Sequence, residues 1–530
     1  MKKSGNRLFT VIFSTTLLLL IASFIIPVSD NSREQLFYDS ESCTSVIVGK
    51  AASVDGSTMT SHSCDSNTDR TWINLVTRQK HKAGSETPVW FDPKRTSGPN
   101  DPEAIEAGYI KQVPETYAFI NTAYPVMNEY QLAIGETTFG GRREMRSTEG
   151  LIDCPELYRL VLERAKTARE AINVIDELTK EYGYNDVGEC FTFADKNETW
   201  HFEMLGPGRG KIGAVWAAVR IPDDHVGVSA NASRIRQINL DDPENYMASD
   251  NVFSLAIEMG LWDPDSGEPF EFCYAYADRN SMGCRRREWR ALSLVAPSLR
   301  LNPNAENYPL SVKPDKKLSV KDVLDIFRDY YAETPYDMTQ TITVADREGK
   351  VVKSPIANPF MSSEMRTFLK IPSERTIACA RATYVTVTQS RNWLPDPVGG
   401  VVWLGYDNPS TTPHTPFYCG ITTMPESYMV DGRAGYRSDC AWWAFRKVSQ
   451  LCGLRYQEMI KDVEAVWREI EEKAFADQKA FEDQVVAILK SNPAKAAEML
   501  TRYSVNMANN SVERYKKLEE ELWSKHTRYF

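Results

Sequence analysis

The sequence has few histidines and none of the residue spacings that mark the common zinc sites. Its six histidines form no HExxH pair, and its ten cysteines form no CxxC pair. Structural and catalytic zinc sites usually place some of their ligands at such short intervals. The sequence therefore argues against a zinc hydrolase and a zinc-finger protein, and it predicts no metal site.

Clustered positive charge is also missing. The 530 residues contain 62 Lys and Arg against 72 Asp and Glu, a net charge of −10, and no basic run is interleaved with aromatic residues. Because nucleic-acid binding depends on basic patches that face phosphates, no nucleic-acid partner is predicted. A hydrophobic content of 42% and a charged content of 25% are close to globular averages. These values exclude wholesale disorder and a multi-span membrane protein.

A long uncharged stretch occurs at the N-terminus. Three basic residues lie within the first seven positions, and residues 8–27 carry no charge. This order is typical of an export signal, so we predict a signal peptide at 1–28 and a polar linker or propeptide at 29–42. An uncleaved signal anchor is the alternative, since about 20 apolar residues span a bilayer. Either way the body is expected outside the cytoplasm, secreted or periplasmic, with a membrane contact only if the leader is retained.

Helical and extended patterns alternate along the rest of the chain. Asp55-Gly56 is a hairpin turn signal between two strand-like segments, and turn clusters separate four further strand-like runs, which predicts an antiparallel meander. Ser319 is placed as the N-cap of a helix. The predicted elements are a hairpin at 44–49 and 58–63, helices within 155–182 and at 320–327, strands at 191–194, 199–204, 214–220, 226–230, 384–388 and 401–404, and a helical tail from Tyr456 that packs on the main body.

The most informative residue is Cys43, which opens the first predicted strand directly after the polar linker. If proteolysis removes everything before it, one residue supplies both a thiol nucleophile and an α-amine. An α-amino group has a pKa of about 7.7–8.0, so near neutral pH it can accept the thiol proton without a distant histidine. The alternative interpretation is a buried structural cysteine at the start of a strand.

Several segments resemble one known family, in the same order along the chain. They are Cys43–Asp65 (CTSVIVGKAASVDGSTMTSHSCD), Asn128-Glu129 with Leu132–Thr138, Trp216–Arg220 with Pro222-Asp223-Asp224, Ala230-Asn231, Thr334–Asp337, and Arg391–Pro397 leading to Trp403-Leu404-Gly405. Together they resemble peptidase family C69, dipeptidases of the N-terminal-nucleophile (Ntn) hydrolase superfamily, which also includes penicillin V acylase and bile salt hydrolase. The resemblance implies an α+β fold at 43–455, an αββα sandwich of two antiparallel sheets between helix layers, with a helical C-terminal extension at 456–530.

The resemblance also implies roles for four residues. Cys43 would be the nucleophile, and Asp65 would hold its mature amine. Asn231 would donate a hydrogen bond to the oxyanion, and Arg287 would lie near the nucleophile. Each of the last three has a simpler interpretation: Asp65 as a turn or surface carboxylate, Asn231 as a turn residue or a glycan acceptor, and Arg287 as part of a solvated basic patch.

Three further residues bear on the choice of substrate. His62 stands where acylases of the superfamily carry arginine, which argues against acylase-type recognition. Glu136 and Thr137 could line the pocket, or they could belong to the core or the surface.

The predicted function is an exported cysteine dipeptidase that hydrolyses short peptides through a thioester acyl-enzyme. Its predicted partners are small peptide substrates, and no cofactor is implied. An amidase or acylase that acts on N-acyl compounds is the alternative among enzymes. A membrane-tethered interaction protein without activity is the alternative outside them.

Overall fold

The computed structural model describes residues 43–66, 69–91, 104–277 and 281–528. These residues belong to one compact unit. The predicted signal peptide and linker lie outside the described residues. All ten cysteines lie within the described ranges, and each is a buried free thiol. No helix of the described part combines the length and the apolar character that crossing a membrane requires.

One sheet has eight strands in the order β15-β13-β12-β11-β10-β9-β8-β3, and each neighbouring pair is antiparallel. Its centre contains the first three strands of the predicted meander. Every residue of β11 and β12 is buried, as expected for strands that are covered on both faces. The strands are β3 (Asn74–Val76), β8 (Phe119–Asn121), β9 (Met127–Asn128), β10 (Ala133–Gly140), β11 (Gly188–Ala194), β12 (Thr199–Leu205), β13 (Val215–Ile221) and β15 (Tyr246–Ala248).

The last strand of the predicted meander leaves this sheet. β14 (Val226–Ser229) pairs with β1 (Ser45–Val48) of a second sheet, so the meander prediction is wrong for this strand. The cause lies in the preceding turn, where the carbonyl of Asp223 accepts hydrogen bonds from the backbone N–H groups of Ala51 and Ala52 at 2.7 and 3.0 Å. These bonds attach the turn to the chain after β1 and carry β14 across to the second sheet.

The second sheet consists of two parts that meet at the predicted hairpin. One part has the order β1-β14-β16 and the other has the order β2-β19-β20-β21. β1 and β2 are joined by a backbone bridge at each end. Between these bridges the Ser61 hydroxyl accepts from Val46 N (2.7 Å) and donates to Val46 O (2.9 Å), so this side chain takes the place of one backbone pair. The predicted hairpin is therefore confirmed. The strands are β2 (Ser61–Cys64), β16 (Ser311–Val312), β19 (Tyr384–Gln389), β20 (Val401–Tyr406) and β21 (Thr415–Tyr418).

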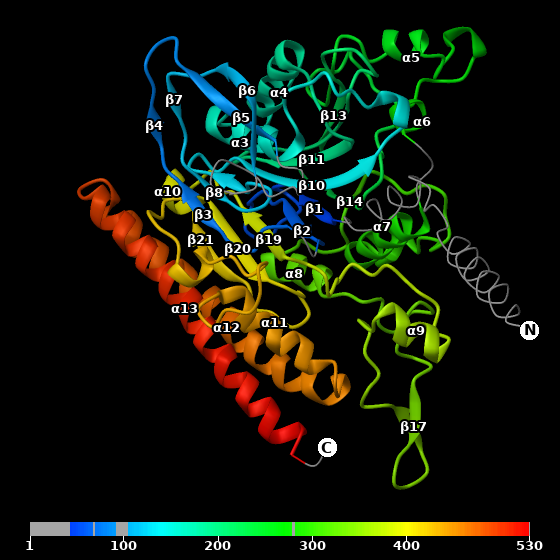
Figure 1. The fold of residues 1–530 in the computed structure, drawn as a ribbon, viewed down its shortest axis with the longest axis vertical. Coiled ribbons are helices and arrows are strands. Elements are labelled where there is room, and N and C mark those ends of the chain that lie inside the picture. The colour runs from blue at the N-terminus through cyan, green and yellow to red at the C-terminus, as the bar shows by residue number, and fades with distance from the viewer. Residues whose placement is uncertain (1–42, 67–68, 92–103, 278–280, 529–530) are drawn as a thin grey trace, which may run out of the picture. The chain divides into compact units, whose positions relative to one another are not determined.

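Helices cover both sheets, as Figure 1 shows. α3 (Cys154–Arg164) and α4 (Ala168–Tyr182) pack on the eight-stranded sheet, whereas α7 (Met282–Val295), α8 (Val320–Phe327) and α11 (Ala441–Cys452) pack on the second sheet. The two sheets contact each other where β1 and β2 meet β10. The predicted αββα sandwich is therefore confirmed.

Local sequence signals account for the starts of these helices. The side chains of Asp153, Thr167 and Ser319 each accept a hydrogen bond from the backbone N–H three residues later, which satisfies an otherwise unpaired donor. Ser319 forms a full capping box with Asp322, which confirms the predicted N-cap. The remaining elements are β4 (Gln79–Lys80), β5 (Glu86–Phe91), β6 (Ile105–Lys111), β7 (Glu115–Thr116), β17 (Thr343–Ala345), β18 (Val351–Lys353), α5 (Ser254–Glu258), α6 (Phe272–Tyr276), α9 (Ser363–Leu369) and α10 (Asp396–Gly399).

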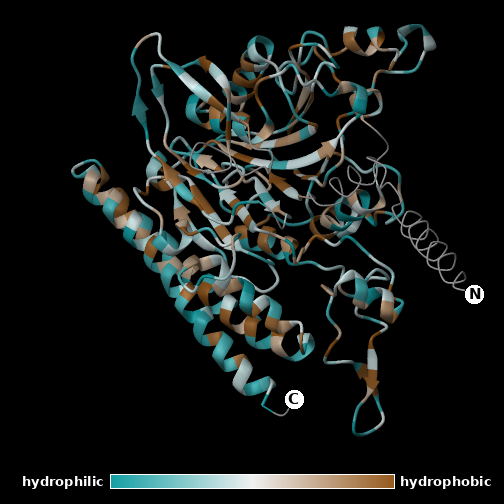
Figure 2. Cartoon of the chain, in the orientation of Figure 1, coloured by the Kyte–Doolittle hydropathy of each residue, from teal (hydrophilic) through white to brown (hydrophobic). Residues whose placement is uncertain are grey.

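The predicted C-terminal helical extension is a pair of long helices, α12 (Tyr456–Leu489) and α13 (Pro493–His526), packed on α11 and β21. Figure 2 shows hydrophilic and hydrophobic residues alternating around both helices, as expected when one face of each is packed. A buried ion pair adds to this contact, because the Glu471 carboxylate of α12 accepts from Arg328 (2.5 Å) and from His414 N (2.8 Å).

Candidate active site

Cys43 lies two residues before the start of β1 and is only 4% exposed. The backbone N–H of Asp65 donates a hydrogen bond to its thiol. Burial raises the pKa of the Cys43 thiol well above its ordinary value, and the negative charges of Glu136 and Asp65 raise it further. Because the thiolate is the nucleophilic form of cysteine, chemistry at this residue requires a base that takes the proton as the sulfur attacks.

Arg287 of α7 is buried and connects Cys43 to Asn231. Its Nη1 donates to Cys43 O (2.5 Å) and Thr44 Oγ1 (3.1 Å). Its Nη2 donates to Ala230 O (3.1 Å) and Asn231 Oδ1 (2.9 Å). Burial lowers the pKa of Arg287, yet an arginine keeps its charge near neutral pH. Arg287 is therefore part of this buried cluster and not of a solvated patch.

Asn231 follows β14 with a φ of 58°, in the left-handed region that asparagine tolerates better than most residues. Its Oδ1 accepts from Arg287, which fixes the orientation of the amide, and its Nδ2 donates to Thr138 O (2.7 Å). An amide nitrogen carries two hydrogens. One of them remains able to donate to a substrate.

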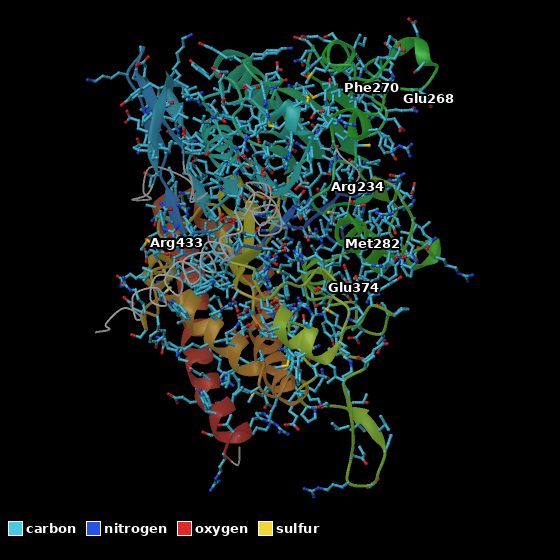
Figure 3. All side chains as sticks on the ribbon, turned by 45° about the vertical axis from the view of Figure 1, so that its right-hand side comes forward. Arg234, Glu268, Phe270, Met282, Glu374 and Arg433 are labelled. Atoms are coloured by element: carbon cyan, nitrogen blue, oxygen red, sulfur yellow. The ribbon has the colours of Figure 1, made fainter. Side chains whose placement is uncertain are left out.

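The loop after Asn231 is attached to β12 by Glu203, a residue that the sequence analysis does not single out. The buried Glu203 carboxylate accepts from the backbone N–H groups of Arg234 (2.6 Å) and Ile235 (3.1 Å) and from Ser233 Oγ (2.5 Å). Arg234, labelled in Figure 3, extends from the same loop. Glu203 thus determines where the loop leaves Asn231.

Asp65 directly follows β2 and is fully buried. Its carboxylate forms an ion pair with Arg375 and accepts a hydrogen bond from Ser63 Oγ (3.2 Å). Burial raises the pKa of Asp65, while the positive charges of Arg375 and Arg287 oppose that rise. Asp65 is therefore a buried carboxylate beside Cys43 and not a surface turn residue.

Arg375 is the functional candidate that sequence reasoning misses. It follows Glu374 in the loop after α9 (Glu374 is labelled in Figure 3). Its side chain packs against Gly283 of α7, where an added Cβ would lie 3.2 Å from the Cβ of Arg375. A single loop arginine, 310 residues from Asp65, carries no sequence pattern that would identify it.

His62 of β2 and Glu136 of β10 complete the surroundings of the thiol. One ligand atom from each of Cys43, His62 and Glu136 lies within 4.8 Å of the other two, and all three residues are buried; no other group of His, Cys, Asp or Glu among the described residues has this geometry. His62 Nε2 and Glu136 Oε2 are 3.3 Å apart but lack the alignment of a hydrogen bond. Burial alone would raise the pKa of Glu136, but the neighbouring imidazole outweighs burial and lowers it.

The structure therefore brings all four predicted site residues together, with Cys43, Asp65 and Arg287 buried and Asn231 partly buried. Glu136, which the sequence offers as a pocket residue, belongs to this cluster. Thr137 points elsewhere, since its Oγ1 lies 2.5 Å from Ser229 Oγ. A sulfur, an imidazole nitrogen and a carboxylate oxygen in this arrangement are also a donor set that suits Zn²⁺.

Comparison with known proteins settles the family. A model of peptidase family C69 matches residues 42–469. The chain belongs to peptidase family C69. The matched segment contains all four predicted site residues and ends inside α12. Membership of this family makes the chain a peptidase, a hydrolase of peptide bonds.

Curated relatives match this C69 peptidase over most of their length. A "Probable dipeptidase" of Latilactobacillus sakei is 26% identical over 480 residues, which cover 87% of this chain and 92% of the relative. A "Probable dipeptidase B" of Lactococcus lactis subsp. lactis is 25% identical over 489 residues, covering 89% and 95%. A "Probable dipeptidase" of Salmonella dublin is 27% identical over 447 residues, covering 77% and 90%.

Proposed function

We propose that this C69 peptidase is an exported cysteine dipeptidase that becomes active when Cys43 is its N-terminal residue. The observation that carries the proposal is the double contact of Arg287, which joins the backbone carbonyl of Cys43 to the side-chain amide of Asn231. One buried arginine thereby keeps the proposed nucleophile and the proposed oxyanion donor in a fixed relation, and fixed donors are a large source of rate enhancement in acyl transfer.

The proposed base is the α-amine of Cys43 itself. While Ser42 precedes Cys43, the nitrogen between them is an amide without a basic lone pair. Cleavage of that bond creates an amine with a pKa of about 7.7–8.0, which can take the thiol proton that burial otherwise keeps on the sulfur. Asp65 lies beside Cys43, and its carboxylate favours the ammonium that forms.

Two steps then hydrolyse the peptide. The Cys43 sulfur bonds to the carbonyl carbon while the α-amine takes the thiol proton, and the second amide hydrogen of Asn231 donates to the developing oxyanion. Collapse breaks the C–N bond, the ammonium returns its proton to the leaving amine, and a thioester remains. Water, deprotonated by the same amine, attacks the thioester, releases the acid and restores the thiol.

A carboxylate beside the nucleophile supports peptides over N-acyl compounds as substrates. Glu136 lies within 4.8 Å of Cys43, and the α-ammonium of a dipeptide is only two bonds from the carbonyl carbon that the sulfur attacks. A buried negative charge attracts this cation, whereas an N-acyl compound has no charge at that position. The names of the relatives, probable dipeptidases, point in the same direction.

A substrate panel separates the enzyme hypotheses. We expect kcat/KM for free dipeptides to exceed that for the same dipeptides N-acetylated by about 100-fold or more, the scale of losing one charge-assisted contact in a buried site. A preference for the acylated compounds would support the acylase alternative. Absence of turnover for both, in protein that begins at Cys43, would support the interaction-protein alternative.

The intact mass of the active enzyme tests the mechanism. We expect the active species to begin at Cys43 and the precursor to be inactive, because the precursor lacks the amine. Full activity in protein that begins well upstream of Cys43 would contradict the mechanism and leave His62 as the base to examine. Accumulation of unprocessed protein in a Cys43→Ala variant would indicate self-cleavage, whereas normal processing of that variant would indicate an external protease.

Export is proposed on the leader sequence alone. Cell fractionation of the full chain and of a chain without residues 1–28 tests it. We expect only the full chain outside the cytoplasm, and equal retention of both chains inside would contradict export.

A further inference from the structure

The arrangement around the thiol has the dimensions of a metal site. In a tetrahedral zinc site with bonds of about 2.0–2.3 Å, the ligand atoms lie about 3.3–3.8 Å from one another. His62 Nε2 and Glu136 Oε2 already have this separation, 3.3 Å. The Cys43 sulfur completes a triangle in which no edge exceeds 4.8 Å, so side-chain adjustments of about 1 Å are enough to reach a common centre.

We propose that Cys43, His62 and Glu136 form an inhibitory binding site for a thiophilic divalent cation such as Zn²⁺. All three residues are at most 4% exposed, and the facing atoms of His62 and Glu136 lie 3.3 Å apart as an ion pair without an aligned hydrogen bond. A cation bound between them would satisfy both atoms and neutralise the negative charge of the carboxylate. It would also bond to the nucleophilic sulfur, and for this reason the cation inhibits hydrolysis instead of assisting it.

The mature N-terminus adds a fourth ligand, a step that rests on the proposed processing. An N-terminal cysteine offers its α-amine and its thiolate to the same cation and closes a five-membered chelate ring. The complete set is then one sulfur, two nitrogens and one oxygen, which fills a tetrahedral site. Binding releases the thiol proton and any proton on the amine or the imidazole to the solvent, so both the nucleophile and its base are blocked together.

Direct binding is measured on the full processed chain with Co²⁺ as the probe, after treatment with a chelator. We expect one Co²⁺ per chain, a near-ultraviolet thiolate-to-cobalt charge-transfer band and the strong visible bands of tetrahedral coordination. Cys43→Ser should remove the charge-transfer band. Stoichiometric Co²⁺ binding without a thiolate band, or no binding at all, would overturn the proposal. These spectra do not depend on peptidase activity, so the proposed function can fail while the site holds.

Inhibition by Zn²⁺ provides the second measurement. We expect Zn²⁺ in a metal buffer to inhibit dipeptide hydrolysis at one site, with activity restored by chelation. His62→Gln and Glu136→Gln should each raise the inhibition constant by at least about 100-fold, since even loss of an outer-sphere partner costs 10–100-fold in affinity. Cys190→Ser is the matched control, because it removes another buried thiol, and its inhibition constant should match that of the wild type. Unchanged constants in both ligand variants would overturn the proposal.

The precursor tests whether the α-amine of Cys43 is the fourth ligand. It retains the three side chains but has no free amine at Cys43. We expect it to show the same charge-transfer band with weaker Co²⁺ affinity than the processed chain. Equal affinity would overturn the assignment of the α-amine as the fourth ligand.

Discussion

Two buried clusters in this molecule have the same composition and different surroundings. The nucleophile cluster is Cys43, His62 and Glu136, and the second cluster is Cys190, His201 and Glu203. In the second cluster Cys190 Sγ lies 3.6 Å from His201 Nε2, which lies 2.7 Å from Glu203 Oε1. By these distances alone, the second cluster looks more like a catalytic triad than the first, in which His62 and Glu136 are 3.3 Å apart without an aligned hydrogen bond.

The two clusters differ in their hydrogen bonds. Glu203 accepts from two backbone N–H groups, from the Ser233 hydroxyl and from His201, and Cys190 accepts from Ser229 Oγ at 3.2 Å. Burial raises the pKa of the Cys190 thiol well above its ordinary value, and no Asn231 or Arg287 contacts it. In the second cluster the Glu203 carboxylate is occupied by donors of the loop that it holds. In the nucleophile cluster, polar atoms of His62 and Glu136 beside Cys43 make no aligned hydrogen bond and can interact with a substrate.

The largest expected effect tests which of the two cysteines is the nucleophile. Cys43→Ala should lower kcat by about 10⁶-fold, the scale seen when a hydrolase loses its nucleophile, with the fold retained. Cys190→Ala is the matched control and should keep kcat within a few-fold, although its small cavity should lower the free energy of unfolding by about 1 kcal/mol. Steady-state kinetics on processed protein and circular dichroism measure both. Loss of activity in Cys190→Ala with Cys43→Ala active would reverse the assignment.

The next effect concerns Asn231, the proposed oxyanion donor, which Arg287 joins to Cys43. Asn231→Ala should lower kcat by about 100- to 1,000-fold, because the amide that stabilises the developing negative charge is lost. KM should change little, since the charge develops only in the transition state. A variant that raises KM and leaves kcat unchanged would instead place Asn231 in substrate binding.

The sequence predicts the parts of this site that carry local signals. Cys43 is found from its position at the start of a strand after a polar linker. Alternating helical and extended patterns predict helices and antiparallel strands, whereas the sandwich itself is implied by the family resemblance. The resemblance supplies Asp65, Asn231 and Arg287, but only the packing of α7 on β14 shows why Arg287 lies beside Cys43.

The parts that depend on long-range contacts have no such signal. Arg375 is a loop arginine whose partner is distant in the chain, and Glu203 is one polar residue in a strand. Both acquire their roles only when strands and loops meet. The same limit explains β14, because the bonds that transfer it to the second sheet are made by backbone groups, which every sequence has.

A third buried histidine–glutamate pair, His414 with Glu471, extends the comparison to stability. Burial opposes ionisation of Glu471, but Arg328 and His414 lower its pKa from 4.5 to about 2. A carboxylate with a lowered pKa contributes stability that is present above pH 4.5 and is lost as the pH falls toward 2. Burial also lowers the pKa of His414 from 6.5. Below pH 6.5 the unfolded chain therefore binds a proton at this residue more readily than the folded chain does, and the free energy of unfolding falls.

Glu471→Gln should therefore lower the free energy of unfolding by about 3 kcal/mol at neutral pH and flatten its dependence on pH between 4.5 and 2, since each pKa unit corresponds to about 1.4 kcal/mol. Urea unfolding at several pH values measures this. Asp477→Asn is the control on the same helix, because its pair with Lys473 is exposed and should contribute at most about 1 kcal/mol. Equal losses in the two variants would contradict a special role for the buried pair.

The smallest expected effect asks whether the second cluster acts on the first. Glu203→Gln keeps the shape of the side chain but replaces one carboxylate oxygen by an amide nitrogen, which cannot accept a hydrogen bond. In the place of Oε1 the nitrogen loses the bonds from Arg234 N and Ile235 N, and in the place of Oε2 it loses the bond from Ser233 Oγ. The loop after Asn231 should shift, and because a misplacement of about 1 Å in an active site costs up to about 100-fold, we expect kcat to fall by about 10-fold with KM unchanged.

A double-mutant cycle distinguishes positioning from general destabilisation. If Glu203 acts by holding Asn231, then Glu203→Gln should cost little further activity once Asn231→Ala has removed the donor, since coupled residues are not additive. If Glu203 only stabilises the fold, the two losses should add, and Glu203→Gln should shift the unfolding midpoint without changing kcat of the folded enzyme. Additive effects would confine the second cluster to structure. Strong coupling would show that Glu203 of the second cluster positions Asn231 for the reaction at Cys43.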